Sequence, residues 1–409
     1  MDILIKPSQL KGCVDIPASK SCAHRALICA ALADGVSVIS GMTFSKDIYA
    51  TINAMSALGA SFDIKDDVVT VRGTDGNIGG QADIDCNESG STLRFIIPIA
   101  AALGADSLFR GKGRLPERPI DIYIRELSKN GVEFLTKTMP YHISGRLTGG
   151  RFEIEGNVSS QFITGLLFAL PLCSEDSEIV LTSRLESRPY VDITLDILRR
   201  FGISVEERAD GFFIKGGQKY TANNERVEGD YSQAAFFYVA NALGADITVD
   251  NLKPDSVQGD KEIVRIISEA TENGVIKGFS ADCSDIPDLV PILSVLGACG
   301  KERSVIYNAE RLRIKESDRL AACADMLGRL GGNVTVTPDG LEIIPTGTLH
   351  GGEVDSFGDH RIVMAAAIAA LKCDGEVIIR GAEAAEKSYP DFFKDYTKLG
   401  GNANVIDLE

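Results

Sequence analysis

Basic side chains recur at one kind of position along this chain, at or just before the start of an expected helix. Lys20 and Arg25 stand at the first such start, Arg118 at another, and Lys315 and Arg319 at a third. A helix N-terminus already presents unpaired N–H groups and the positive end of its dipole, so a cation is disfavoured there unless an anion binds beside it. In a chain of formal net charge −16, this placement predicts that the cations converge on a small ligand with several negative charges.

Hydroxyl, amide and carboxylate side chains accompany these cations. Ser and Asp also cap helices, so capping stays an alternative explanation for each of them taken singly. The segment Arg313–Arg319 has a second interpretation too, as an exposed helix face with ion pairs one turn apart. Besides the cations named above, the helix starts carry Ser21, Lys46, Asp47, Ser89, Gly90, Ser91, Arg94, Ser159, Ser160, Gln161, Ser187, Arg188, Asp230, Ser232, Asp288, Glu316, Asp359, His360, Arg361, Lys387 and Ser388.

These positions correspond because the chain repeats one unit six times, with a spacing of roughly 55 to 70 residues. The first unit, Ala23–Gly73, reads as a small-residue helix, a strand, a second helix that ends in Leu58-Gly59, and two strands. The first helix is apolar all round and should be buried, whereas the second has a 3.6-residue period and should be half exposed. Further copies begin near Ser91, Ser160, Ser232, Pro287 and Asp359, and the final strands of the fourth copy look short or missing.

The repeats predict an α/β protein of two domains, because three units that close around their buried helices make one compact domain of about 200 residues. The expected domains are residues 19–227, and residues 1–18 together with 228–409. The stretch Met1–Ala18 is expected to form a strand that pairs within the second domain.

Composition excludes several classes of function. The net charge of −16 repels nucleic acids and anionic membranes, and no run of about 18 uncharged apolar residues is present to span a bilayer. The start of the chain does not read as a signal peptide, and nine scattered Cys fit a reducing compartment. Only four His occur, far apart, which argues against a metal site. We therefore expect a cytoplasmic monomer that binds small molecules, with no nucleic acid or membrane partner.

Ten segments also occur in the order and spacing of a known enzyme family. They are SKSCAHRAL, NESGSTLRF, GKGRLPERP, SSQF, SRPYVDITL, GDYSQAAFF, IPD, RIKESDR, GDHRIVMA and KSYPDFF. Over essentially its whole length the chain resembles the 5-enolpyruvylshikimate-3-phosphate synthase family of enolpyruvyl transferases. The resemblance implies two inside-out α/β domains, each of three βαβαββ-like units, with the active site in the interdomain cleft and no cofactor or metal.

The resemblance also implies roles for individual residues. Asp288 would take the proton from the 5-hydroxyl of shikimate 3-phosphate, and Glu316 would protonate the methylene carbon of phosphoenolpyruvate, with Lys20 close by. The shikimate 3-phosphate site would comprise Lys20, Ser21, Arg25, Ser159, Ser160, Gln161, Ser187, Asp288 and Lys315. The phosphoenolpyruvate site would comprise Lys20, Gly90, Arg118, Gln161, Arg319, Arg361 and Lys387.

Three other functions are weaker. The sister enzymes that transfer enolpyruvyl to UDP-N-acetylglucosamine usually have Lys-Asn in place of Lys20-Ser21, and a reactive Cys in the loop that corresponds to Arg110–Pro119, which has none. RNA 3′-phosphate cyclases share the repeat unit, but the charge argues against nucleic acid. A non-catalytic binding protein would not need both Asp288 and Glu316. Departures from the family pattern are Phe95 and Arg311, while Gly90 predicts room for the herbicide glyphosate.

Overall fold

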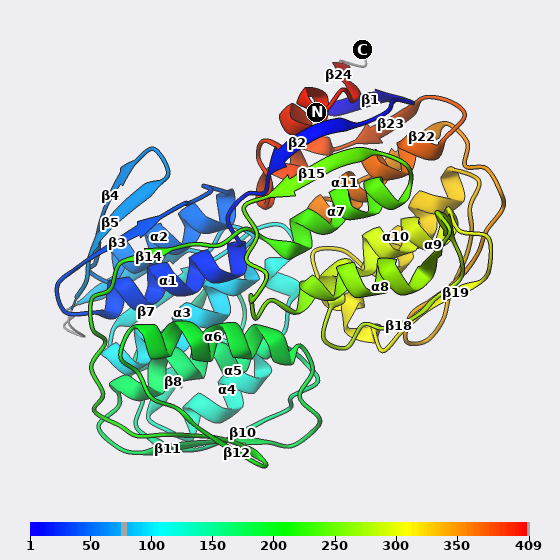
Figure 1. Cartoon of the computed structure of the whole chain (residues 1–409). Helices are drawn as coiled ribbons and strands as arrows, with labels where there is room; N and C mark the ends of the chain where they lie inside the picture. The colour runs from blue at the N-terminus through cyan, green and yellow to red at the C-terminus, as the bar shows by residue number, and fades with distance from the viewer. Residues whose placement is uncertain (75–79, 407–409) are drawn as a thin grey trace. The chain divides into compact units, whose positions relative to one another are not determined.

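The computed structural model describes residues 1–74 and 80–406 and divides into two units (Figure 1). Unit 1 comprises Met1–Pro17 and Gly229–Glu409, and unit 2 comprises Ala18–Glu228. Each unit has a hydrophobic core of its own. Each can therefore be described as a separate folded body.

The sheets of unit 2 share one topology. In each, two parallel strands are followed by two antiparallel ones, giving the orders β14-β3-β5-β4, β6-β7-β9-β8 and β10-β11-β13-β12. Side chains alternate between buried and exposed, as in β6, so that one face of each sheet packs inward. The strands are β3 Val36–Ser40, β4 Ser61–Lys65, β5 Val68–Arg72, β6 Gln81–Asp85, β7 Asp106–Arg110, β8 Val132–Phe134, β9 Tyr141–Gly145, β10 Gly150–Ile154, β11 Ser177–Leu181, β12 Glu206–Arg208, β13 Gly211–Ile214 and β14 Glu225–Arg226.

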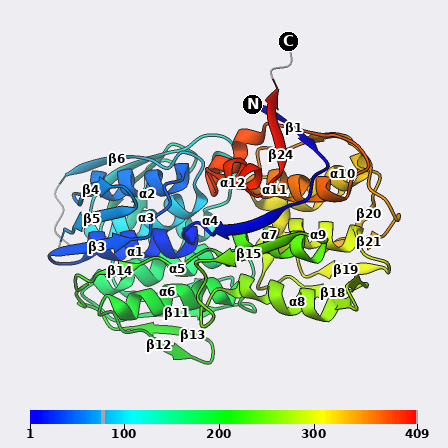
Figure 2. The same ribbon diagram turned by 45° about the horizontal axis from the view of Figure 1, so that its top comes forward.

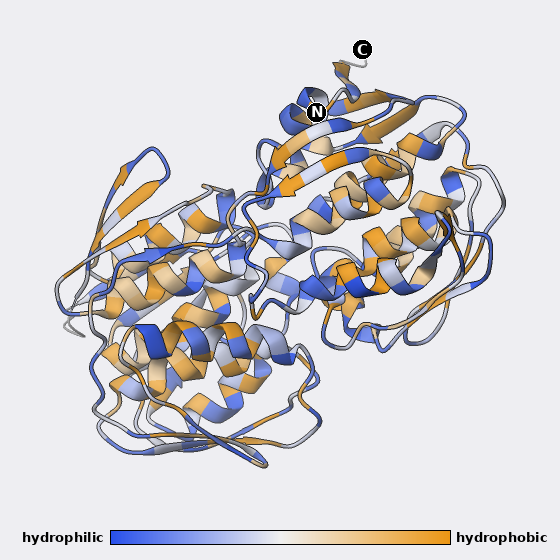
Figure 3. Cartoon of the chain, in the orientation of Figure 1, coloured by the Kyte–Doolittle hydropathy of each residue, from blue (hydrophilic) through white to orange (hydrophobic). Residues whose placement is uncertain are grey.

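The helices of unit 2 lie inside these sheets (Figure 1). Nearly every residue of α1, α3 and α5 is buried, whereas α2, α4 and α6 bury one face, and the apolar colouring of Figure 3 follows this division. Gly165 lets α5 approach α3 closely, since a Cβ there would lie 2.3 Å from the carbonyl oxygen of Arg94. The helices are α1 Lys20–Leu32, α2 Lys46–Ala57, α3 Gly90–Leu103, α4 Asp121–Ser128, α5 Ser160–Ala169 and α6 Arg188–Arg200.

Two sheets of unit 1, β22-β23-β1-β24 and β18-β19-β21-β20, have the same topology, while β15-β2 and β16-β17 are two-stranded. The start of the chain contributes two strands to this unit. Strand β1 (Asp2–Lys6) lies between β23 and β24, and β2 (Lys11–Asp15) pairs in parallel with β15. The other described strands of this unit are β15 Asp246–Asp250, β16 Thr271–Glu272, β17 Val275–Ile276, β18 Ser280–Asp282, β19 Ser304–Tyr307, β20 Asn333–Val336, β21 Leu341–Ile344, β22 Gly352–Asp355, β23 Val377–Arg380 and β24 Asn402–Ile406.

Helices α7, α9 and α11 are the buried ones in unit 1, and α8, α10 and α12 are half exposed. Short 3-10 turns precede four of these helices: η3 (Gly259–Lys261) before α8, η4 (Pro287–Leu289) before α9, η5 (Glu310–Ile314) before α10 and η7 (Ala382–Lys387) before α12. The helices are α7 Tyr231–Ala242, α8 Glu262–Ala270, α9 Val290–Ala298, α10 Arg319–Arg329, α11 His360–Ala369 and α12 Phe392–Lys398.

The α/β fold class predicted from the repeats is confirmed. The fourth copy ends in strands of two residues each, β16 and β17, as its sequence suggested. Gly59 has φ +96°, the left-handed conformation expected after Leu58 at the end of α2. The pairing predicted for Met1–Ala18 is confirmed as well, although this stretch forms two strands rather than one.

Over residues 1–74 and 80–406, no helix is long and apolar enough to cross a membrane. The same residues contain no group of three or more His, Cys, Asp or Glu side chains arranged to hold a metal ion.

Candidate active site

In unit 2, Lys20 begins α1 beside the start of α2. Its Nζ lies 3.0 Å from Oδ2 of Asp47, and the two side chains are 19% and 14% exposed. Ser19 caps α1 by accepting a hydrogen bond from the backbone N–H of Cys22 at 3.4 Å. The Lys20 ammonium group is therefore held at a helix start that remains accessible to a ligand.

Arg25, one turn further along α1, is buried among neutral oxygens. Its Nε donates to Thr194 Oγ1 at 2.8 Å, and its two terminal nitrogens donate to the carbonyl oxygens of Ser21 at 2.7 Å and Tyr190 at 2.9 Å. Burial lowers the pKa of Arg25 to about 10. Within the described part of the chain no carboxylate pairs with this guanidinium, so an anionic ligand at the start of α1 would be stabilised by it.

Gly90 begins α3 directly against two guanidinium groups. A Cβ added to Gly90 would lie 2.5 Å from Arg118 Nη1 and 3.5 Å from Arg94 Nη1. Gln161 joins this group, because its Oε1 accepts from Arg94 Nη1 at 2.7 Å and its Nε2 donates to Ser91 Oγ at 3.0 Å. The structure thus brings Gly90, Arg118 and Gln161 together around a helix N-terminus, an arrangement suited to a phosphate or a carboxylate.

The serines predicted at helix starts differ in whether their side chains cap the helix. Ser159 accepts from the backbone N–H of Gln161 at 3.3 Å, so it caps α5, and Ser160 is the first residue of that helix. Ser187 precedes α6 in a left-handed conformation, φ +55°, and its side chain does not cap the helix. Capping therefore accounts for Ser159 but leaves the buried Ser187 hydroxyl to be explained otherwise.

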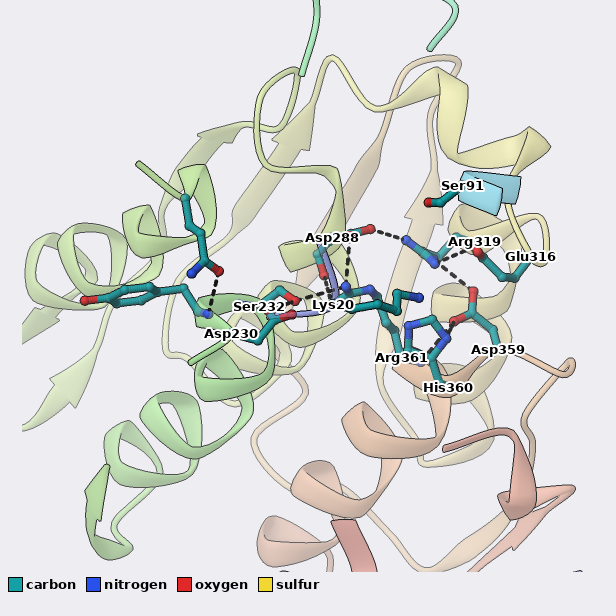
Figure 4. Close-up of polar contacts among 12 residues, drawn as sticks. Lys20, Ser91, Asp230, Ser232, Asp288, Glu316, Arg319, Asp359, His360 and Arg361 are labelled. Carbon is teal, nitrogen blue, oxygen red and sulfur yellow. Dashed lines mark hydrogen bonds and ion pairs between the residues drawn. The ribbon is translucent and has the colours of Figure 1, made fainter. Parts of the chain in front are cut away.

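In unit 1 the predicted residues converge on Arg319 (Figure 4). This side chain is 1% exposed and meets three carboxylates: its Nη1 donates to Asp288 at 2.8 Å, its Nη2 to Glu316 at 2.8 Å and its Nε to Asp359 at 2.9 Å. The interpretation of Arg313–Arg319 as an exposed helix face is wrong, because α10 begins only at Arg319 and Asp318 caps it.

Arg361, in the first turn of α11, holds the same aspartate from another direction. Its Nη2 donates to Asp288 Oδ2 at 2.8 Å and to Ser232 Oγ at 3.0 Å, and its Nη1 donates to the Asp288 carbonyl oxygen at 3.2 Å. Asp288 therefore accepts from Arg319 on one carboxylate oxygen and from Arg361 on the other.

The charges of this cluster shift the pKa values of its members. Burial would raise the pKa of Asp288, but Arg361, Arg319 and Lys315 outweigh it and hold the pKa well below its usual range. Burial lowers the pKa of Lys315 to about 8, with Arg311 acting in the same direction and Asp288 against it. Asp288 is thus a carboxylate at neutral pH, and Lys315 is close to the point at which it loses its proton.

Lys387 lies at the end of η7, next to the approach to α11. Its Nζ donates to the carbonyl oxygen of Gly358 at 2.8 Å, one residue before Asp359. The structure therefore places Lys387 beside the same helix start that carries Arg361.

Asp359 and Arg94 hold the predicted site residues in position. The sequence places both at helix starts, but neither was assigned to the substrate sites. The fully buried Asp359 caps α11 through the backbone N–H of Arg361 at 2.9 Å and pairs with Arg319. In unit 2, Arg94 plays a comparable part, since it bonds both Gln161 and the carbonyl oxygen of Pro119, the residue after Arg118. The only sequence signal for either was its place at a helix start.

Both units thus gather arginines, lysines and hydroxyl groups at helix N-termini, and unit 1 adds three carboxylates around Arg319. Fold and site define a class of α/β enzyme that acts on small polyanionic substrates with acid–base help. The family model of EPSP synthase (3-phosphoshikimate 1-carboxyvinyltransferase) matches residues 4–396. The chain belongs to this family.

Individual relatives agree with the family match. The 3-phosphoshikimate 1-carboxyvinyltransferase of Clostridium novyi is 46% identical, with 99% of this chain and 98% of the relative covered, and that of Clostridioides difficile is 44% identical with the same coverage. Among solved structures, an EPSP synthase from Acinetobacter baumannii is similar with a TM-score of 0.83 and 26% identity, over 99% of this chain and 100% of the other.

Proposed function

We propose that this chain transfers the enolpyruvyl group of phosphoenolpyruvate to the 5-hydroxyl of shikimate 3-phosphate and releases inorganic phosphate. The observation that carries the proposal is the cluster of unit 1, in which Asp288 and Glu316 share the guanidinium of Arg319. Both substrates are small acids with phosphate and carboxylate groups, which suits the cations of both units.

The reaction needs an acid and a base. Protonation of the methylene carbon of phosphoenolpyruvate by Glu316 leaves a cationic centre at the neighbouring carbon. The 5-hydroxyl attacks that centre and gives its proton to Asp288, and a tetrahedral adduct results. Glu316 then takes a proton back from the new methyl group while Asp288 gives its proton to the departing phosphate, which restores the double bond and returns both carboxyl groups to their starting states. These steps are proton transfers and additions, so the residues of the chain suffice for them.

Arg319 and Arg361 would stabilise negative charge on the substrates. In the free protein Arg319 is bonded to Asp288, Glu316 and Asp359. An incoming phosphate or carboxylate would displace Glu316 from the guanidinium, and Glu316, no longer paired with a cation, would take up a proton from water and so become the acid. The negative charge of the bound anion would also offset part of the positive charge around Asp288. The pKa of that carboxylate would then rise toward the range of a useful base.

The remaining residues would hold the substrates. Shikimate 3-phosphate would contact Lys20, Ser21, Arg25, Ser159, Ser160, Gln161, Ser187, Asp288 and Lys315. Phosphoenolpyruvate would contact Lys20, Gly90, Arg118, Gln161, Arg319, Arg361 and Lys387. The counter-ion that Arg25 lacks within the described residues, and the glycine against Arg118, support these two assignments.

The alternative acceptor, UDP-N-acetylglucosamine, is not favoured, since the family match and the relatives above are named for the shikimate 3-phosphate reaction. We further propose that the protein works as a monomer in the cytoplasm and binds no nucleic acid, as its charge of −16 suggests.

The test is to mix the purified protein with shikimate 3-phosphate and phosphoenolpyruvate and to follow inorganic phosphate. Release should require both substrates, and the product should carry the mass of the enolpyruvyl ether. UDP-N-acetylglucosamine in place of shikimate 3-phosphate should give none. The proposal would be refuted if phosphate were released from phosphoenolpyruvate with UDP-N-acetylglucosamine but not with shikimate 3-phosphate, or if it were released with no acceptor present.

A further inference from the structure

A buried chain of hydrogen bonds joins three helices of unit 2 beneath the helix starts described above. His24 Nδ1 lies 2.7 Å from Thr51 Oγ1, Thr51 Oγ1 lies 2.8 Å from Thr92 Oγ1, and Thr92 Oγ1 donates to Ser89 Oγ at 2.8 Å. All four residues are at most 1% exposed. These hydrogen bonds run from α1 through α2 to the N-cap of α3, and Figure 2 shows the three helices side by side.

The hydrogen bonds of this chain can run in only one direction. Thr92 gives its hydroxyl hydrogen to Ser89, so the contact between the two threonines must use the hydrogen of Thr51. The contact between Thr51 and His24 then needs a hydrogen on Nδ1 of the imidazole. Any other arrangement would leave two lone pairs facing each other at a hydrogen-bond distance in the protein interior.

The surroundings of His24 agree with this tautomer. Burial, together with the positive charges of Lys20 and Arg25, holds the pKa of His24 well below its usual value, so the ring is neutral. Its Nε2 has no hydrogen-bond partner among residues 1–74 and 80–406. The imidazole ring lies nearly perpendicular to the ring of Phe95, with centroids 6.4 Å apart.

These hydrogen bonds connect the two helix starts of unit 2 that carry Lys20 and Gly90. His24 lies one helical turn after Lys20, and Thr51 lies one turn after Asp47, so the ion pair between Lys20 and Asp47 is repeated one turn deeper as a buried hydrogen bond. At its other end, Ser89 caps α3 by accepting from the backbone N–H of Thr92 at 3.1 Å, directly before Gly90.

We propose that His24, Thr51 and Thr92 are positioning residues, which fix the first turn of α3 at Gly90 relative to Lys20 on α1. The inference rests on the proposed function, because it assigns both Gly90 and Lys20 to phosphoenolpyruvate. A ligand that bridges two helix starts is bound well only when their separation is held, and a buried one-way chain of hydrogen bonds holds it more firmly than exposed ion pairs do.

Thr51→Val tests the proposal in the enzyme, since valine keeps the shape of threonine and removes the central hydroxyl. Loss of this link should raise the KM for phosphoenolpyruvate about fivefold to tenfold, with the KM for shikimate 3-phosphate within about twofold of the wild type. Thr51→Ser keeps the hydroxyl and should restore the KM for phosphoenolpyruvate.

Thr164→Val is the matched control, because Thr164 is equally buried and its Oγ1 lies 3.0 Å from Thr194, the hydrogen-bond partner of Arg25. It should lower Tm by a similar amount and change the KM for shikimate 3-phosphate instead. A folded Thr51→Val enzyme with an unchanged KM for phosphoenolpyruvate, or one with both KM values raised equally, would overturn the proposal.

The tautomer can be measured without any substrate. In protein labelled with ¹⁵N-histidine, the His24 ring should carry its hydrogen on Nδ1, with a bare Nε2, at every pH from about 5.5 to 8.5. Comparison with the Thr51→Val spectrum identifies the resonance. A hydrogen on Nε2, or protonation of the ring within this range, would contradict the chain of hydrogen bonds and leave the proposed activity untouched. If the wild-type protein showed no activity with shikimate 3-phosphate, the proposed function would be refuted instead.

Discussion

Replacing Gly90 with alanine would place a methyl group against the guanidinium of Arg118. The new Cβ would lie 2.5 Å from Arg118 Nη1, but 3.5 Å from Arg94 Nη1 and 3.6 Å from Gln161 Oε1. The last two separations are ordinary contacts, so Arg118 alone has to move, by about 1 Å, to regain a normal distance of about 3.5 Å. Because the atom displaced is the far end of a flexible side chain, the fold should accommodate the change with little loss of stability.

The consequence should be confined to the ligand that Arg118 binds. A misplacement of about 1 Å in a group that orients a substrate can cost up to about a hundredfold in rate, and a weakened charge-assisted hydrogen bond costs about 1.5 to 3 kcal/mol. The KM for phosphoenolpyruvate should therefore rise about tenfold to a hundredfold in Gly90→Ala. The Kd for shikimate 3-phosphate should stay within about twofold of the wild type.

Three measurements on Gly90→Ala would check these expectations. Steady-state kinetics with each substrate varied gives the KM values, titration calorimetry gives the Kd for shikimate 3-phosphate, and scanning calorimetry gives Tm. Gly328→Ala is the matched control, because Gly328 lies in α10 and a Cβ there would meet no atom within 4 Å. That variant should keep both KM values and gain up to about 1 kcal/mol of stability from the lower chain entropy of alanine. A Gly90→Ala enzyme with an unchanged KM for phosphoenolpyruvate would refute the placement of that substrate against Arg118.

Three further changes probe the carboxylates and the lysine of unit 1. Glu316→Gln should leave the Kd of both substrates nearly unchanged and slow turnover at least ~100-fold, as measured by phosphate release; unimpaired turnover would exclude Glu316 as the acid. Asp359→Asn removes one charge of a buried pair with Arg319 and should lower the free energy of unfolding in urea by about 3 kcal/mol; a stability equal to that of the wild type would show that the pair contributes nothing. Lys315 has a pKa of about 8, and only its charged form attracts a phosphate, so kcat/KM for shikimate 3-phosphate should fall as the pH rises through about 8. Lys315→Arg should remove this fall, because arginine keeps its proton, and a fall that persists in the variant would assign it to another group.

Local patterns in the sequence determine much of this protein. The 3.6-residue period and the Leu-Gly ending of the second helix are local properties, and Gly59 adopts the left-handed conformation they predict. Apolar residues all round a helix signal burial wherever the helix lies, and α1, α3 and α5 are buried accordingly. Order and spacing of the ten segments were enough to indicate the family, because order and spacing can be read directly along the sequence.

Only the tertiary structure decided which side chains at those helix starts meet. Asp359 pairs with Arg319 across 40 positions of sequence, and Thr51 bonds both His24 and Thr92 across 27 and 41. Neither the aspartate nor the threonine differs in sequence from an ordinary helix residue, since Asp is a common cap and Thr a common buried hydroxyl. Helix propensity and hydrophobic period depend on neighbours within a few residues, whereas these contacts depend on how separate helices pack against one another, and that packing is a property of the whole unit.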